Sequence, residues 1–213
     1  MAAVAFPHDF KTLKLQSGTV YSYVYIPAQP GLPTILFLHG FPSSCYDWRF
    51  QIAHFRARGY GVLAPDLLGY GETDRPSDAE AYRGKKMTSE IVEILDHEGV
   101  EVVHGVAHDW GCFLLGRLAN YYPKRLQSAS FLVVAYRPPG EVIDLDGLNA
   151  MSKKAVGYET FGYWRFFERE EAGEIVDKNV STFVPSYFVL AMKTDKACPQ
   201  DFTCFILSLG NSY

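Results

Sequence analysis

The feature that most constrains the fold is an alternation of short apolar runs with amphipathic stretches between residues 34 and 135. Solidly apolar runs suit strands that are buried on both faces of a sheet. Apolar residues at helical spacing mark the stretches between them as helices packed on that sheet. The alternation therefore predicts an α/β fold, a mostly parallel sheet with helices on both faces. The expected strands are 34–38, 61–64, 102–107 and 130–135, and the expected helices are 46–58, 86–97 and 111–121.

The two ends of the chain differ from this central region. Residues 11–15 and 20–26 have the pattern of a β-hairpin. After residue 139, helical and aromatic stretches replace the buried strands, which indicates a separate helical segment. The expected organisation is a core over 1–137, a helical segment over 138–192 and an irregular tail over 193–213.

Composition narrows the class of protein. Hydrophobic residues make up 48 % of the 213 residues, which favours a large core over disorder. The net charge of −4 comes without a basic stripe, so no nucleic-acid partner is expected. No apolar run is long enough to span a membrane, and residues 1–17 lack the apolar centre of a secretory signal, so a cytoplasmic protein is expected. The cysteines lack the spacing of a zinc site and are expected to be buried free thiols: Cys45, Cys112, Cys198 and Cys204.

Two motifs that can carry chemistry stand directly after expected strands. The first follows strand 34–38 and the second joins strand 102–107 to helix 111–121: His39-Gly40-Phe41-Pro42 and Ala107-His108-Asp109-Trp110-Gly111. Ligand sites in open α/β sheets lie beyond the carboxyl ends of the strands. The functional site is therefore expected at this edge of the sheet.

The second motif has the spacing of a nucleophile elbow, with small residues two positions before and after Asp109. Such an elbow is a strained strand-to-helix turn, in which side chains bulkier than those of Ala107 and Gly111 would collide. The turn places residue 109 at a helix N-terminus, where the helix dipole favours a negative charge. A carboxylate there stays ionised and can act as a nucleophile. A plain helix N-cap is the alternative role for Asp109.

With these motifs, the chain resembles the epoxide hydrolase branch of the α/β-hydrolase family over roughly residues 10 to 180. The resemblance rests on His39-Gly40-Phe41-Pro42-Ser43-Ser44, Asp66-Leu67-Leu68-Gly69-Tyr70-Gly71, His108-Asp109-Trp110-Gly111 and Phe161-Gly162-Tyr163. It implies an α/β-hydrolase core with a helical lid, a cis peptide bond before Pro42, and neither metal nor organic cofactor. The implied partner is a small, apolar epoxide substrate.

The resemblance also implies roles for individual residues. Asp109 is similar to the nucleophile that opens an epoxide and forms an alkyl ester. The backbone N–H groups of Phe41 and Trp110 correspond to the oxyanion hole, which needs donors aimed at the charge that develops during ester hydrolysis. Four residues of the two motifs support these groups: His39, Gly40, Pro42 and Gly111.

Tyr163 resembles the first of two lid tyrosines that hydrogen-bond the epoxide oxygen, a role that suits a phenol. The second lid tyrosine is not placed by the sequence. Plain packing within an aromatic run is the alternative role for Tyr163. His39 and His108 are expected to be structural turn residues rather than catalytic bases.

The chain departs from the family pattern at several positions. Ala107 stands where the family has glycine, and His104 stands mid-strand where the family has an aliphatic residue. The sequence ends before the two strands that would supply an acid and a general-base histidine, so a truncated or alternatively ended form is expected. Asp144 and Asp146 stand where some relatives keep an alternative acid. Strand 130–135 would then be an exposed sheet edge and a route to self-association.

Two other functions remain open. A haloalkane dehalogenase uses the same aspartate and elbow, but by resemblance it carries asparagine at the position of Phe41 and lacks the lid tyrosines. A catalytically inactive form of the enzyme is the second alternative, since no general-base histidine is found in the sequence.

Overall fold

The computed structural model describes residues 1–179 and the backbone of residues 205–208. The chain divides into two compact units. The first holds residues 1–139 together with the strand at 205–208, and the second begins at Gly140. Each unit is described by itself.

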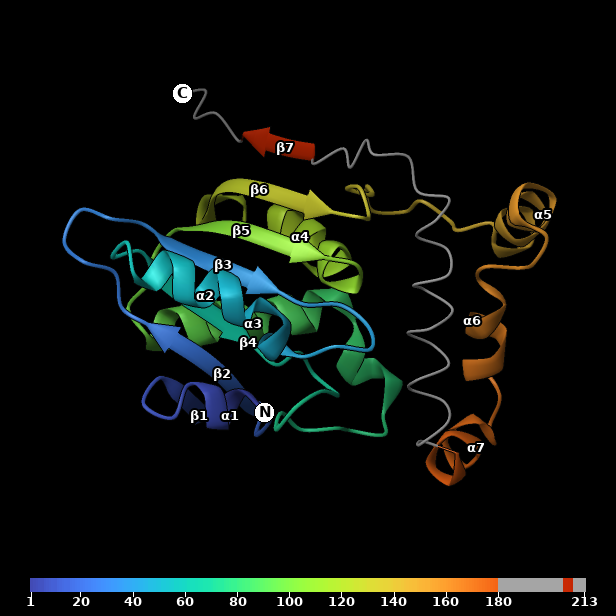
Figure 1. Ribbon diagram of the computed structural model, residues 1–213, viewed down its shortest axis with the longest axis horizontal. Coiled ribbons are helices and arrows are strands. Elements are labelled where there is room, and N and C mark those ends of the chain that lie inside the picture. The colour runs from blue at the N-terminus through green and yellow to red at the C-terminus, as the bar shows by residue number, and fades with distance from the viewer. Residues whose placement is uncertain (180–204, 209–213) are drawn as a thin grey trace. The chain divides into compact units, whose positions relative to one another are not determined.

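The first unit is built on one sheet (Figure 1). Its strands are β1 (Phe10–Lys14), β2 (Val20–Ile26), β3 (Thr34–Leu38), β4 (Gly61–Pro65), β5 (Val103–His108), β6 (Leu126–Leu132) and β7 (Phe205–Ser208). Their order across the sheet is β1-β2-β4-β3-β5-β6-β7. The central strands β4, β3, β5 and β6 are parallel, whereas β1, β2 and β7 each pair antiparallel with their neighbours. The predicted α/β fold with a parallel centre is confirmed.

Helices cover both faces of this sheet, as predicted. One core cluster joins the sheet to α1 and α2, and the other joins it to α3 and α4. Strands β3 and β4 are buried along their whole length because each lies between these two layers. The helices of this unit are α1 (Ala2–Ala5), η1 (Cys45–Trp48), α2 (Arg49–Arg56), η2 (Ala79–Tyr82), α3 (Gly84–His97), α4 (Trp110–Tyr121) and η3 (Pro123–Arg125).

The two faces of β5 are covered unequally. Val103 and Ala107 are buried, whereas His104, Val106 and His108 on the opposite face are only half-buried. This alternation explains how His104 is accommodated in mid-strand. Its Nδ1 lies 2.7 Å from Ser128 Oγ on the neighbouring strand β6, so the imidazole is hydrogen-bonded and partly solvated.

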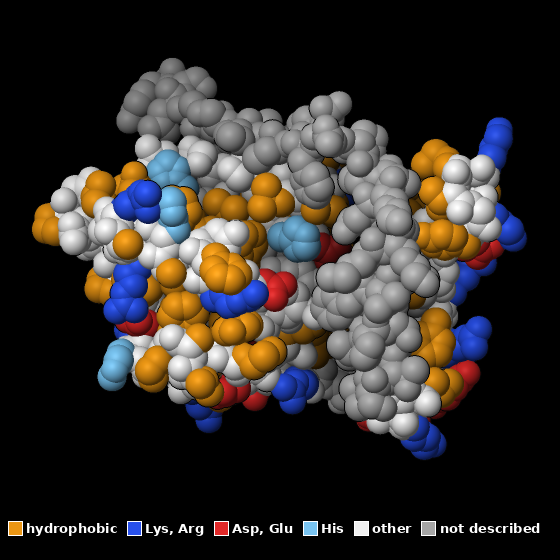
Figure 2. Space-filling model, viewed as in Figure 1, with side chains coloured by type: hydrophobic (Ala, Val, Ile, Leu, Met, Phe, Trp, Pro, Cys, Tyr) orange, Lys and Arg blue, Asp and Glu red, His pale blue; other side chains and the backbone are white. Residues whose placement is uncertain are grey.

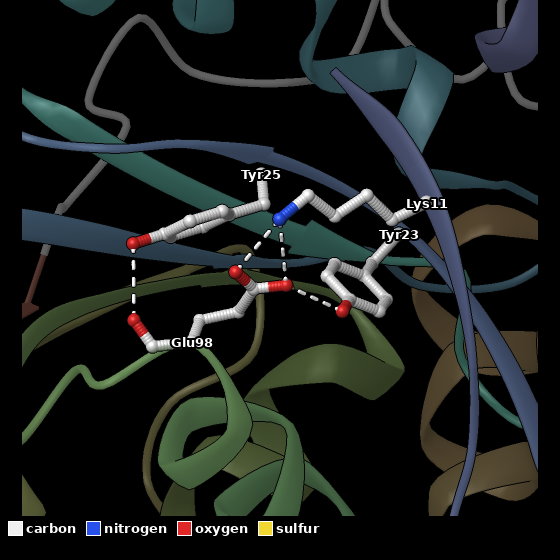
Figure 3. A network of polar contacts seen from close by, with 4 residues as sticks. All are labelled: Lys11, Tyr23, Tyr25 and Glu98. Atoms are coloured by element: carbon white, nitrogen blue, oxygen red, sulfur yellow. Dashed lines mark hydrogen bonds and ion pairs between the residues drawn. The ribbon is translucent and has the colours of Figure 1, made fainter. Parts of the chain in front are cut away.

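The N-terminal hairpin is attached to the end of α3 by a polar network around Glu98 (Figure 3). Lys11 Nζ lies 3.0 and 2.8 Å from the two Glu98 carboxylate oxygens, and the Tyr23 hydroxyl donates to Oε1 at 2.6 Å. The Tyr25 hydroxyl donates to the Glu98 backbone carbonyl at 3.2 Å. Only 6 % of the Glu98 side chain is exposed, so the pairing satisfies a carboxylate that would be costly to bury alone.

A second buried carboxylate, that of Glu90 within α3, also binds the hairpin. The Tyr21 hydroxyl donates to Glu90 Oε2 at 2.9 Å, and the hydroxyls of Ser17 and Thr19 donate to Oε1. The side chains of β2 are buried in both core clusters of the sheet. These hydrogen bonds add to that packing and fix the position of the hairpin on α3.

The C-terminal part of the first unit differs from the predictions. Residues 193–213 are not wholly irregular, because Phe205–Ser208 forms β7 and pairs antiparallel with β6. The run is short, but Phe-Ile-Leu has high strand propensity. The prediction that strand 130–135 forms a sheet edge is therefore wrong, and the argument for self-association loses its basis. The strand β6 covers Leu126–Leu132 and so begins and ends earlier than the predicted 130–135. It ends earlier because Val133 has a positive φ of 74°.

In its described part, the second unit contains helices and turns: α5 (Leu145–Val156), α6 (Gly162–Phe167) and α7 (Ala172–Lys178). The buried amide of Asn149 organises the α5–α6 connection, because its Oδ1 accepts the Phe161 N–H at 2.9 Å. Helix α5 ends at Gly157, whose φ of 90° is readily adopted only by glycine. The predicted boundary between residues 192 and 193 lies outside the described residues.

Two surface properties bear on the partners of this protein. None of the described helices is both long and apolar enough to cross a bilayer. On the face shown in Figure 2, basic and acidic side chains of the first unit lie among apolar ones. Cys45 and Cys112 are buried free thiols, as predicted, and Cys198 and Cys204 lie outside the described residues.

Replacing Tyr21 with Phe is expected to lower the free energy of unfolding at neutral pH by about 1–3 kcal/mol, because the buried Glu90 carboxylate loses a donor. Burial, with the negative charge of Glu90 adding to it, raises the pKa of Tyr21 above its ordinary value. In the unfolded chain this phenol titrates near pH ~10. Its contribution is complete below about pH 10 and is lost as the pH rises further, since only the unfolded chain then releases the proton.

Urea unfolding at neutral and alkaline pH measures both effects. The wild type should lose stability above about pH 10 more steeply than Tyr21→Phe. Tyr121→Phe is the matched control, because the Tyr121 side chain is exposed. Equal alkaline slopes for the wild type and Tyr21→Phe would contradict the assignment.

Candidate active site

The parallel centre of the sheet brings the two motifs together. Strands β3 and β5 are neighbours, and Leu38 lies opposite Ala107 in their register. Both strands therefore end at the same edge of the sheet. There β3 leads into His39–Pro42, and β5 leads into the turn at Asp109.

Asp109 forms the predicted sharp turn between β5 and α4. Its φ and ψ of 52° and −122° are rare for a residue with a side chain and cost about 1–3 kcal/mol. Backbone hydrogen bonds hold the turn: the Asp109 N–H donates to the Leu132 carbonyl at 3.3 Å, and the Cys112 N–H donates to the Asp109 carbonyl at 2.9 Å. The Cys112 thiol also donates to the Leu132 carbonyl, at 3.3 Å. Burial raises the pKa of this thiol to about 11, so it stays neutral.

Two glycines make room for the turn. A Cβ on Gly111 would collide with the backbone carbonyls of Leu38 and His39, so α4 can approach β3 closely only at a glycine. A Cβ on Gly40 would collide with the Asp109 side chain itself. Ala107, where the family pattern has glycine, is buried within the strand without such a conflict.

The Asp109 carboxylate points toward the first motif. The Phe41 N–H donates to Asp109 Oδ1 at 2.9 Å. Although Asp109 occupies the N-cap position of α4, its side chain makes no capping hydrogen bond, which argues against a plain capping role. The N-terminus of the 12-residue helix α4 stabilises the negative charge. The peptide bond between Phe41 and Pro42 is cis, as the resemblance implies.

Trp110 opens helix α4 directly after Asp109. Its indole is 41 % exposed and packs edge-to-face on Phe113, with 6.2 Å between ring centroids. Two large apolar side chains at this edge of the sheet form a surface suited to an apolar ligand.

His39 is a structural residue in this arrangement. Its Nε2 accepts the Leu67 N–H at 2.9 Å, so the ring proton lies on Nδ1, which donates to the Gly40 carbonyl at 2.9 Å. Burial lowers the pKa of His39 and keeps the ring neutral. Both nitrogens are therefore occupied in holding the first motif in place.

Asp66 is a structural centre to which the sequence analysis assigns no role. It directly follows β4, and its buried carboxylate accepts from the Cys45 N–H at 2.8 Å and from the Ser22 hydroxyl at 3.0 Å. Gly71, with φ of 55°, passes so close that a Cβ would collide with this carboxylate. Its position after a buried strand and before a glycine-rich loop is the signal that could have identified it.

A cavity of about 230 Å³ was also not anticipated. It is lined by His39, Asp47, Trp48, Gln51, His108 and Leu132. No sequence signal marks it, because its walls come from three separate segments that only the folded sheet brings together.

The remaining candidates lie in the second unit. Tyr163 is on α6, where its ring contacts Trp164 and Phe167. Asp144 caps α5 by accepting the Gly147 N–H at 2.9 Å, and Asp146 forms an ion pair with Arg165. Both aspartates thus have structural partners. Among the described residues, no three His, Cys, Asp or Glu side chains gather as metal ligands would.

Comparison with known proteins agrees with this geometry. Residues 33–162 match the family model described as the alpha/beta hydrolase fold. The chain is 29 % identical over 178 residues to bifunctional epoxide hydrolase 2 of Mus musculus, covering 78 % of this chain and 31 % of that protein. It is 38 % identical over 114 residues to epoxide hydrolase A of Mycobacterium tuberculosis, covering 54 % and 35 %.

Solved structures give the same result. The crystal structure of an epoxide hydrolase from Vigna radiata is 31 % identical, with a TM-score of 0.68, over 84 % of this chain and 56 % of that one. Epoxide hydrolase A from Mycobacterium thermoresistibile is 29 % identical, with a TM-score of 0.65, over 80 % and 52 %. The chain spans about a third of the length of these curated relatives and about half of these solved chains. With the family model matching more than half of its residues, the chain belongs to the alpha/beta hydrolase fold family.

Proposed function

We propose that this protein hydrolyses epoxides, with Asp109 as the nucleophile. One observation carries the proposal: a carboxylate on a strained elbow, at the N-terminus of α4, accepts the backbone N–H of Phe41. A hydrolase with a serine at this position would form an acyl-enzyme, but a carboxylate attacks carbon by displacement and forms an alkyl ester. The similarity to epoxide hydrolases supports the same chemistry.

In the first step, an Asp109 oxygen attacks one epoxide carbon and the bond from that carbon to the epoxide oxygen breaks. The released oxygen needs a proton or a strong hydrogen bond, which by resemblance Tyr163 supplies from the helical lid segment 138–192. The half-buried Asp109 carboxylate makes no capping hydrogen bond to α4, so its oxygens are not used to hold the helix end. The N-terminus of α4 stabilises its negative charge for the attack.

In the second step, water attacks the carbonyl carbon of the ester and an oxyanion develops. The Phe41 N–H already points at Asp109 Oδ1, the atom that would carry that charge. Together with the Trp110 N–H at the start of α4, it forms the proposed oxyanion hole. The attacking water must lose a proton, so this step also needs a base.

The substrate class follows from the same surroundings. Trp110 and Phe113 present apolar rings beside the elbow, which suits a small apolar epoxide. Displacement by a carboxylate and hydrolysis by water need neither a metal nor an organic cofactor. The haloalkane dehalogenase alternative is less favoured, since Phe41 has no side-chain amide to hold a halide. An inactive protein remains the third alternative.

Incubation with styrene oxide is expected to produce a single covalent adduct on the protein, detected by intact-mass spectrometry after rapid acid quenching. Asp109→Asn should abolish the adduct, because an amide is a much weaker nucleophile. Asp177→Asn is the matched control, since Asp177 is exposed on α7. An adduct that persists in Asp109→Asn, or the absence of both adduct and diol in the folded wild type, would overturn the proposal.

A second test distinguishes epoxide hydrolysis from haloalkane dehalogenation. With matched concentrations of styrene oxide and a primary bromoalkane, the protein should form diol and release no halide above the buffer background. Halide release that disappears in Asp109→Asn would favour the dehalogenase alternative instead.

Gly40→Ala is expected to slow adduct formation by about 10²-fold, because the added methyl group displaces the Asp109 carboxylate. Gly162→Ala is the matched control, as a Cβ there makes only an ordinary contact 3.7 Å from Glu159. Adduct formation rates are compared by quenched-flow mass spectrometry, with circular dichroism to verify folding. Equal rates in the two variants would contradict the steric argument.

A further inference from the structure

Among the residues that the structure describes, two with side chains have a left-handed backbone: Asp109 with φ of 52° and Val133 with φ of 74°. The elbow accounts for Asp109. Val133 is the more unusual of the two, because β-branched residues rarely adopt a positive φ. Its side chain is 62 % exposed and belongs to neither core cluster, so burial does not offset the strain. Such strain persists only where the surroundings hold it, and it is most common at functional sites.

The two left-handed residues follow the ends of neighbouring strands. Strands β5 and β6 run parallel and side by side (Figure 1), and their last pair in register is His108 with Leu132. Asp109 comes directly after the first of these residues and Val133 directly after the second. Both strands therefore end in a strained residue at the same level of the sheet.

The Leu132 carbonyl connects the two strained residues. It accepts the Asp109 N–H and the Cys112 thiol, each at 3.3 Å. This carbonyl lies in the rigid peptide plane that joins Leu132 to Val133, so φ at Val133 sets how the plane is turned relative to the chain that follows. If that chain stays in place, rotation of Val133 to an ordinary negative φ turns the carbonyl away from the elbow.

The chain that follows, residues 134–137, is fixed on α4, and we call it the α4 strap. The Tyr136 hydroxyl donates to Asn120 Oδ1 at 2.8 Å, and Arg117 Nη1 donates to the Arg137 carbonyl at 3.1 Å. Both partners lie on α4, the helix that begins at the elbow. The left-handed residue is therefore held between β6 on one side and the α4 strap on the other.

We propose that Val133 is a positioning residue for the Asp109 nucleophile. Its left-handed backbone aims the Leu132 carbonyl at the Asp109 N–H, and this contact helps to keep the carboxylate against the Phe41 N–H. The inference rests on the proposed function and deepens its first step. The alternative is a turn that only leads the chain off the sheet, which would leave the reactivity of Asp109 unaffected.

The first test compares two substitutions of Val133 by the rate of adduct formation with styrene oxide. Proline fixes φ near about −65° and cannot adopt the left-handed conformation, whereas the extended Leu132 suits a residue before proline. Val133→Pro should slow adduct formation by at least about tenfold, since a misplacement of about 1 Å can cost about 10²-fold. Val133→Gly should retain the wild-type rate, because glycine adopts a positive φ at no steric cost.

Hydrogen exchange of the Asp109 amide, followed by NMR, gives a second measurement that does not depend on turnover. In Val133→Pro this amide should exchange at least about tenfold faster, because it loses the Leu132 carbonyl as its acceptor. In Val133→Gly it should exchange as in the wild type. The amide of Leu36, buried in β3, should keep its protection in both variants, which excludes a general loss of stability.

Val142→Pro is the matched control, because it also replaces an exposed valine by proline. It should leave both the adduct rate and the Asp109 exchange unchanged. Should Val133→Pro not fold, as judged by circular dichroism, Tyr136→Phe replaces it. Loss of the bond from the α4 strap to Asn120 should slow adduct formation about fivefold, as loss of one hydrogen bond commonly does.

Adding Val133→Gly to Tyr136→Phe should then restore the wild-type rate, because glycine keeps a positive φ without the help of the α4 strap. A turn without influence on Asp109 would give no such rescue. Equal rates in Tyr136→Phe and in the double variant would therefore overturn the inference.

An unchanged adduct rate in folded Val133→Pro, or a slower rate without faster exchange of the Asp109 amide, would overturn the role of Val133 and leave the proposed function standing. Absence of both adduct and diol in the folded wild type would overturn the proposed function. The exchange measurement would still decide whether Val133 holds the elbow, so the two failures are distinguishable.

Discussion

The left-handed backbone of Asp109 is the constraint on which the whole site depends. A residue with a side chain adopts this conformation only where its surroundings enforce it. Here the enforcing contacts come from β6, through the Leu132 carbonyl, and from the loop after β3, through Gly40 and the Phe41 N–H. The carboxylate therefore gains its position and its backbone N–H donor from the same packing that strains its backbone.

The rest of the first unit keeps the ends of β3, β5 and β6 in place. Asp66 ties the end of β4 to β2 and to η1, which carries one wall of the cavity. Glu90 and Glu98 fix the hairpin to α3, which packs on α4. Each of these carboxylates is buried and fully paired, so they position elements without leaving a charge unsatisfied. The proposed chemistry at Asp109 and the stability of the sheet thus rest on separate acidic residues.

The differences between prediction and structure share one cause. The periodicity of apolar residues predicted the central strands and helices well, since burial on a sheet depends on local pattern. It missed β7, whose four residues are too few to show a period, and it extended β6 past Val133, because positive φ at a β-branched residue has no sequence signature. It also assigned no role to Asp66, because the partners of that carboxylate are distant in the chain.

By itself, the sequence determined the parallel sheet, the elbow at Asp109 and the first motif after β3, because small residues and apolar runs at fixed spacing leave few other folds. Only the tertiary structure decided which groups meet. It directed the Phe41 N–H at the carboxylate, occupied both nitrogens of His39, and left the imidazole of His108 facing a cavity built from three segments. The physical reason is that local sequence sets backbone geometry, whereas the surroundings of a side chain depend on the register between strands.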